Sequence, residues 1–246
     1  MPTAPAAREP VLVTGLTNQE FLERHARPGC IGLSGGVTLV DKAICRAERH
    51  LDEQERWGVW SHAFIFQGRR ADGHHWVLES DLQIHHKHIR LGVQENRVTK
   101  YHDEKLFGNL AVLDFGLTET QLNTVLAEGL ELVATRARYS VRELFGTLFA
   151  LRNPTRRAGQ NLLAQDHSLY CSAFVQHLFR KAGLELLPDV EHKHSTPEEI
   201  ARTIIPHTMY LLQRETPRSR LRLLGRKIRS RVKARVRMMK RKTDPA

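Results

Sequence analysis

Two short segments, far apart in the sequence, carry residue types that could perform nucleophilic chemistry. Cys171 lies at the start of an apolar stretch with helical spacing that runs to Ala182. A thiolate at a helix N-terminus is stabilised by free backbone N–H groups and by the helix dipole. The earlier segment, Trp60 to Phe66, has the composition of a strand and carries His62 near its start. A histidine on a rigid strand can take the proton of a thiol, so the pair predicts a cysteine-nucleophile site.

A carboxylate could orient His62 across a β-hairpin. Residues 62–66 and 75–79 read as two strands, with residues 67–73 as the turn between them. If the pairing is symmetric about the turn, His62 lies directly opposite Glu79. Directly opposed side chains on one face are close enough to hydrogen-bond, and the acid would then fix the imidazole tautomer. A register slip of one residue would separate them onto opposite faces.

Both residue types also have a structural explanation. A lone buried cysteine usually packs as a small hydrophobic residue, and a strand histidine often serves packing or lies at the surface. The helix-start position of Cys171 and the irregular stretch before it, residues 153–164, favour the catalytic interpretation.

Capping signals define the elements that must position these residues. Thr17, Thr118 and Thr196 each precede a Glu or Gln by three residues, which predicts helices starting at residues 18, 119 and 197, and Ser140 with Glu143 predicts another. Strands are predicted over 30–36, 84–91 and 110–115, the last of them buried, and a helix over 37–51. The sequence therefore predicts an α+β fold, with an antiparallel sheet packed against helices.

Charge is distributed unevenly along the 246 residues. Residues 218–242 contain 13 Lys and Arg and no acidic residue, whereas the rest of the chain has 25 basic and 27 acidic residues. The net charge of +11 therefore belongs to the C-terminal segment. We predict a disordered N-terminal lead over 1–14, one catalytic domain over 15–212, and a basic amphipathic tail over 213–246.

Cysteine usage and the lack of long apolar runs indicate the compartment. Cys30, Cys45 and Cys171 are odd in number and irregularly spaced, which is typical of free thiols in a reducing environment. Residues 1–10 lack the apolar run of a secretory signal, and no run is long enough to span a membrane. We expect a cytoplasmic protein, peripheral at the inner membrane face if the tail binds lipid, with signal-free export left open.

The same motifs resemble a known family. Ser61-His62 matches a Ser-His strand, Val77-Leu78-Glu79 an apolar strand ending in an acid, Tyr170-Cys171-Ser172 a helix start, and Thr196-Pro197 a downstream helix start. In this order, with the histidine before the cysteine, they resemble the circularly permuted papain-like cysteine amidases. These are the YaeF/YiiX-like branch of the NlpC-type superfamily, relatives of the lecithin:retinol acyltransferase group. The resemblance covers roughly residues 25–205 and rests on order and spacing together.

The resemblance implies a permuted papain-like (NlpC-type) fold and a role for each matching residue. Cys171 would be the nucleophile, His62 the base and Glu79 the orienting acid, with the backbone N–H of Cys171 in the oxyanion hole. Tyr170, Ser172 and Ser61 would lie near the substrate or the oxyanion. The chain departs from the family pattern at Gly29-Cys30, where Gly-Asp is common, and at Ala173, where an acid is favoured.

Other chemistry is less well supported. A group of histidines suggests a metal site, but no carboxylate or cysteine follows at ligand spacing, so a polar sheet edge is the better interpretation (His74, His75, His85, His86 and His88). The glycines of residues 29–36 are not followed by Gly-Lys-Ser/Thr, which argues against a phosphate-binding loop. We expect no metal and no cofactor.

The tail has helical periodicity as well as charge. Apolar side chains, including Leu224, Ile228 and Val232, recur on one face, while Arg229, Lys233 and other basic residues fill the rest. A basic amphipathic helix of this kind suits an anionic membrane surface. Binding to nucleic acid would need the charge but not the apolar stripe, and the tail has no aromatic residue for base stacking, so it is the second choice.

Together these features predict a cysteine hydrolase or acyltransferase that cleaves an amide or acyl bond in a peptide or lipid. The alternative is a non-catalytic membrane- or nucleic-acid-binding protein that keeps the fold as a scaffold.

Vesicle binding tests the predicted role of the tail. Anionic vesicles should bind the chain with about 1 kcal/mol for each basic residue at the surface, and less in high salt. Deleting residues 217–246 should abolish binding. Replacing Leu224, Ile228 and Val232 with Ser keeps every charge and should weaken co-sedimentation with vesicles. Binding equal to wild type would show that the tail is only a polycation.

Overall fold

The computed structural model describes residues 9–51, 54–85, 88–135, 171–188, 190 and 195–214. The chain forms two compact units, Met1–Leu212 and Gln213–Ala246. Several predictions lie outside the described residues: Tyr170, the helix predicted after Ser140, and the tail with Leu224, Ile228, Arg229, Val232 and Lys233. None of the helices in the described ranges has the length and apolar character needed to cross a membrane.

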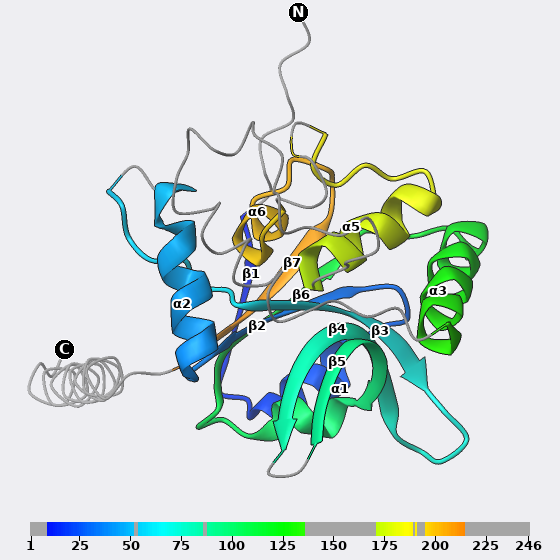
Figure 1. The fold of residues 1–246 in the computed structure, drawn as a ribbon, viewed down its shortest axis with the longest axis horizontal. Coiled ribbons are helices and arrows are strands. Elements are labelled where there is room, and N and C mark those ends of the chain that lie inside the picture. Colours follow the sequence, from blue (N-terminus) through cyan, green and yellow to red (C-terminus); the bar gives the residue numbers. More distant parts are fainter. Residues whose placement is uncertain are drawn as a thin grey trace, which may run out of the picture. The chain divides into compact units, whose positions relative to one another are not determined.

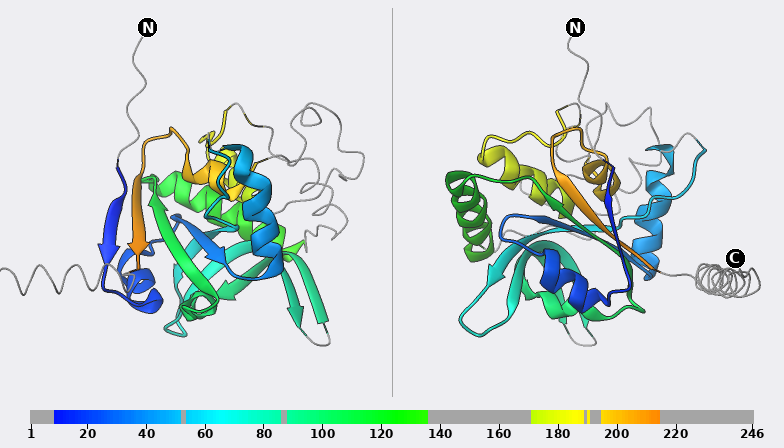
Figure 2. Two further views of the ribbon diagram at one scale, coloured as in Figure 1. Left: turned by 90° about the vertical axis from the view of Figure 1, so that its left-hand side faces the viewer. Right: turned by 180° about the vertical axis from the view of Figure 1, so that it is seen from behind.

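A seven-stranded sheet is the centre of the described unit (Figure 1). Its strand order is β1-β7-β6-β2-β3-β4-β5. The strands are β1 (Val11–Thr14), β2 (Ile31–Gly36), β3 (His62–Arg69), β4 (His75–His85), β5 (His88–Arg97), β6 (Phe107–Asp114) and β7 (Thr208–Gln213). The pairs from β7 through β5 are antiparallel. Edge strand β1 runs in the same direction as β7 (Figure 2), so the sheet is mixed and not purely antiparallel.

Strand β1 also corrects the predicted N-terminal lead. Residues 11–14 were expected to be disordered, but Val11–Thr14 form this edge strand. The segment is short, its Val-Leu-Val-Thr composition is typical of a strand, and its pairing partner β7 lies near the other end of the sequence. The prediction was wrong because a four-residue strand gives little local signal.

Helices cover both faces of the sheet. Three of them, α3 (Glu119–Ala134), α5 (Cys171–Lys181) and α6 (Pro197–Ala201), lie on one side, whereas α1 (Asn18–His25) lies on the other (Figures 1 and 2). The predicted capping boxes at Thr17, Thr118 and Thr196 are all present, each with both reciprocal hydrogen bonds. The helix predicted over 37–51 is α2 (Leu39–Ala47) followed by the 3₁₀ turn η1 (Glu48–Leu51).

The alternation of side chains along β3 builds two hydrophobic cores. Ala63 and Ile65 belong to the core that contains Phe174 and Leu178 of α5. The intervening residues Phe64 and Phe66 belong to a second core, with Phe21 of α1 and Tyr101 of the 3₁₀ turn η2 (Val98–His102). Helix α5 is therefore packed against one face of the strand that carries His62.

The hairpin register differs from the symmetric prediction by two residues. Ile65 pairs with Leu78 and Phe66 with Val77, so continuing this register sets His62 opposite Asp81. The register shifts between Phe66 and Gly68, and Gly68 has a φ of 108° that only glycine adopts readily. Strand β3 continues three residues beyond its predicted end, so that Arg69 pairs with His75, and the bulge between Phe66 and Gly68 takes one residue back. Because the shift is even, His62 and Glu79 stay on the same face as diagonal neighbours.

The next hairpin also differs from its prediction. The strand predicted over 84–91 is the tip of two longer strands, since β4 continues to His85 and β5 begins at His88. This long hairpin leads directly into η2.

Gly32 tests the close packing beneath the site. A Cβ at this position in β2 would lie 2.2 Å from the ring of Phe64, which is fully buried and stacked on Tyr101 with ring centroids 4.2 Å apart. Gly32→Ala should therefore lower the free energy of unfolding by about 1–3 kcal/mol, as overpacking does. Gly108→Ala in β6 is the control, because nothing lies within 4 Å of its added Cβ. Equal urea midpoints for the two variants would contradict the predicted clash.

Candidate active site

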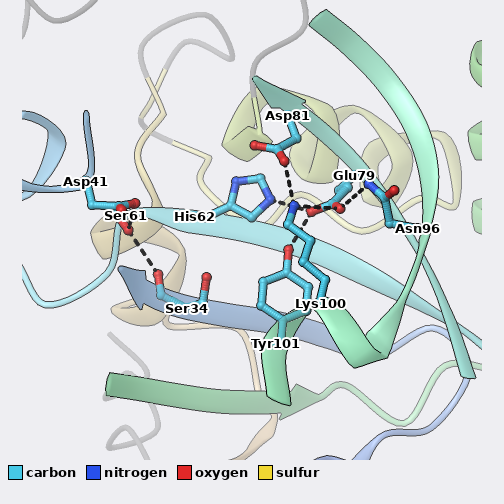
Figure 3. Close-up of polar contacts among 9 residues, drawn as sticks. All are labelled: Ser34, Asp41, Ser61, His62, Glu79, Asp81, Asn96, Lys100 and Tyr101. Atoms are coloured by element: carbon cyan, nitrogen blue, oxygen red, sulfur yellow. Dashed lines mark hydrogen bonds and ion pairs between the residues drawn. The ribbon is translucent and has the colours of Figure 1, made fainter. Parts of the chain in front are cut away.

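His62 and Glu79 are in direct contact. The imidazole Nε2 of His62 lies 2.7 Å from Oε2 of Glu79 (Figure 3). The side chain of Glu79 is fully buried, while that of His62 is 13% exposed. His62 opens β3 and Glu79 lies within β4, so two paired strands fix the distance between them.

Four side chains hold the Glu79 carboxylate. Oε2 accepts hydrogen bonds from Tyr101 Oη as well as from His62. Oε1 accepts from Asn96 Nδ2 at 2.6 Å and from Lys100 Nζ at 2.9 Å (Figure 3). Both oxygens are therefore satisfied, as a buried carboxylate requires.

The electrostatics of this cluster favour charged forms of both catalytic candidates. Burial alone would raise the pKa of Glu79, but the Lys100 cation and the hydrogen bond with His62 hold that pKa well below its usual range. Burial alone would lower the pKa of His62, but hydrogen bonds with Cys171 and Glu79 raise it to about 10. At neutral pH the pair is a carboxylate holding an imidazolium.

Tyr101 and Lys100 keep the protons with which they donate to Glu79. Burial and the charge of Glu79 raise the pKa of Tyr101 well above its usual range, so its hydroxyl remains a donor. Burial would lower the pKa of Lys100, but Glu79 and Asp81 more than compensate and raise it, so the amine stays charged.

Cys171 is the first residue of α5 and is half-buried. It differs from the other two thiols by having His62 as an interaction partner. Burial and nearby carboxylates, chiefly Asp114 for Cys30 and Glu48 for Cys45, raise the pKa of each of these thiols to about 12. Among the three cysteines, therefore, only Cys171 is placed for nucleophilic chemistry.

The serines beside the catalytic candidates are used inside the protein. Ser172 Oγ donates to the carbonyl of Ser195 at 2.7 Å and joins the start of α5 to the segment before α6. Ser61 Oγ donates to Asp41 at 2.7 Å and accepts from the backbone N–H of Gly36. Both side chains are buried and hydrogen-bonded within the protein.

Ala173 is also buried beside the start of α5. The position two residues after Cys171, where the resembling family favours an acid, is buried in this chain. A carboxylate there would need a buried partner, so alanine fits the apolar packing of α5.

Sequence reasoning missed Asn96, Lys100 and Tyr101. Asn96 lies at the end of β5, and Lys100 and Tyr101 lie in η2, which follows β5 in the sequence. A Lys-Tyr pair in a short polar turn has no distinctive pattern, and only the long β4–β5 hairpin brings it to Glu79.

No group of three or more His, Cys, Asp or Glu in the part of the chain that the structure describes could hold a metal ion. His86, one of the histidines considered above, lies outside the described residues.

Comparisons with known proteins give a weak similarity to solved structures. No family profile and no curated protein sequence matches the chain. Among solved structures, the crystal structure of metalloprotein YiiX from Escherichia coli resembles this one, with 15% identity and a TM-score of 0.43. The similarity covers 78% of this chain and 99% of that one. At this TM-score the similarity carries no argument about the fold or the function.

Glu79→Gln tests whether the buried carboxylate is ionised. An amide cannot accept from all four donors, so near pH 7 the variant should lose about 1–3 kcal/mol of unfolding free energy. The folded-state pKa of Glu79 lies below its ordinary value of 4.5, so its contribution is complete above that pH and is lost as the pH falls below it. Urea titrations should therefore show the two proteins converging in acid. If the difference in unfolding free energy between the two proteins stayed constant down to about pH 2, this result would contradict an ionised Glu79.

Proposed function

We propose that this chain is a cysteine hydrolase or acyltransferase that works through Cys171, His62 and Glu79. The observation that carries the proposal is the buried, fully hydrogen-bonded contact of Glu79 with a histidine whose other partner is the thiol of Cys171. A buried ionic cluster contributes little net stability, and perturbed pKa values concentrate at functional sites. A catalytic role explains why these charges are buried together.

In the proposed reaction, the Cys171 sulfur attacks the carbonyl carbon of an amide or ester, and the carbonyl electrons move to oxygen. His62, as imidazolium, donates its proton to the leaving amine or alcohol when the tetrahedral intermediate collapses to a thioester. His62 then accepts a proton from water or another acceptor, which attacks the thioester and releases Cys171. Glu79 stabilises the imidazolium and fixes its tautomer.

The start of α5 offers a place for the oxyanion. The backbone N–H of Cys171 belongs to the first turn of the helix, where N–H groups have no partner within the helix. A carbonyl oxygen that develops negative charge there would gain from that donor and from the helix dipole.

The substrate class follows from the family resemblance and the tail. The resemblance favours amide bonds in peptides or acyl bonds in lipids, and a basic amphipathic tail favours a substrate held at an anionic membrane.

Thiol labelling separates the enzyme from the non-catalytic scaffold. Near pH 7 iodoacetamide should alkylate Cys171 much faster than Cys30 or Cys45, because only Cys171 interacts with an imidazolium, while the other two pKa values are raised to about 12. Peptide mapping by mass spectrometry measures the three rates in the folded protein. Equal rates would favour the scaffold.

Variants of the proposed triad should lose activity unequally. On a substrate found by screening acyl-lipid and peptide libraries, Cys171→Ala should be inactive and His62→Ala should lose about 10²–10⁴-fold in kcat. Glu79→Gln should keep a measurable remainder, because the acid orients the base and does not react. Wild-type turnover by His62→Ala would refute the proposed mechanism.

A further inference from the structure

Lys100 contacts the oxygen of Glu79 that His62 does not use. Its Nζ lies 2.9 Å from Oε1 of Glu79, whereas His62 lies 2.7 Å from Oε2. The amine also pairs with Asp81 Oδ2 and lies 5.2 Å from the centre of the Tyr101 ring. Lys100 therefore contacts Glu79 and Asp81, and its connection to His62 runs through the Glu79 carboxylate (Figure 3).

A fully buried carboxylate needs a nearby cation to remain ionised. Once protonated, Glu79 would be neutral and could no longer stabilise the imidazolium of His62. His62 supplies a positive charge only while it is protonated, and during turnover it gives that proton away. Lys100 is a cation throughout the proposed cycle, because carboxylates on two sides raise its pKa.

The orientation of Glu79 also depends on Lys100. Oε1 accepts from Lys100 and Asn96, and Oε2 accepts from His62 and Tyr101. Donors on both sides prevent the carboxylate from rotating, so Oε2 stays directed at His62.

We infer that Lys100 is a positioning residue of the active site: it keeps Glu79 ionised and aimed at His62, and so extends the proposed triad by a fourth member. This inference rests on the proposed function. It assigns a role in catalysis to a residue that touches neither the substrate nor the reacting atoms.

The groups around Glu79 come from every element packed on it. They are His62 of β3, Asp81 of β4, Asn96 of β5, Tyr101 of η2 and, beyond His62, Cys171 of α5. Asp81 competes for Lys100 and adds negative charge near His62, so it supports the imidazolium but disfavours ionised Glu79. Tyr101 and Asn96 donate hydrogen bonds without charge. Lys100 therefore brings the permanent positive charge of this group.

The pH profile of Cys171 alkylation tests the inference without a substrate. Rates with iodoacetamide are measured by peptide mapping between pH 3 and pH 9 in the full chain, with circular dichroism at each pH to confirm folding. Lys100→Met keeps much of the side-chain volume and removes the charge. Glu79 should then take up its proton at higher pH. The acid limb of the profile, in which the alkylation rate falls as the pH is lowered, should therefore move to higher pH by about one to three units. Lys105→Met, at an exposed site just after η2, should leave the limb unchanged.

Two further variants separate a positioning role from a structural one. Lys100→Arg restores the charge and should return the limb toward its wild-type position. Lys100→Met/Asp81→Asn removes both charges of the ion pair and should still show the raised limb, because Glu79 lacks its cation.

The possible outcomes differ for the two proposals. If Cys171 is alkylated faster than the other two cysteines but the acid limb of its pH profile does not move in Lys100→Met, or in the double variant, the role of Lys100 would be overturned. The proposed function would still stand. A wild-type Cys171 that reacts no faster than Cys30 and Cys45 would instead overturn the proposed function. A raised limb in both Met variants, with recovery in Lys100→Arg, supports the inference.

Discussion

The candidate site depends on keeping one negative charge, that of Glu79, in a place without water. Removing a carboxylate from solvent costs several kcal/mol unless charges and hydrogen bonds replace the lost hydration. Here His62, Lys100, Asn96 and Tyr101 together supply that replacement. They come from β3, β5 and η2, and the strand order, which places β4 between β3 and β5, brings them to Glu79.

The aromatic packing beneath the cluster adds rigidity. Tyr101, which donates to Glu79, is stacked on Phe64, and Phe64 fills the space above Gly32. Phe64 and His62 lie two residues apart on the same strand. The same packing therefore fixes the position of His62 and that of Tyr101, which donates to Glu79. On the other face, Ala63 and Ile65 pack with Phe174 and Leu178 of α5, the helix that begins with Cys171. A catalytic site needs this kind of support, because small displacements of its groups are costly.

Local patterns in the sequence predicted local structure well. Thr17, Thr118 and Thr196 predicted helix starts because a capping box involves only residues three apart. The apolar stretch after Cys171 likewise predicted α5. Pairing was harder: the two-residue register error arose because β3 continues to Arg69, where the sequence predicted a turn, while the bulge at Gly68 offsets one residue of that difference. Strand β1 was missed because it is short and pairs with β7, far away in the sequence.

The difference between local patterns and long-range pairing also explains which residues of the site could be predicted. His62, Glu79 and Cys171 could be selected because their chemistry is distinctive and the hairpin brings two of them close. Lys100 and Asn96 could not, because their role depends on the length of the β4–β5 hairpin and on the turn that follows it. Nothing in a lysine on a polar segment reveals that its partner is a buried carboxylate.

The most direct test of the central claim is the charge state of His62. Nitrogen chemical shifts of its imidazole, followed by NMR from about pH 5 to pH 11 in the uniformly ¹⁵N-labelled protein, report that state directly. If ionised Glu79 holds the imidazolium beside Cys171, His62 should stay doubly protonated at neutral pH and lose its proton near pH 10. In Glu79→Gln the transition should move to lower pH. A wild-type His62 that titrates at or below its ordinary value of 6.5 would contradict the charged site.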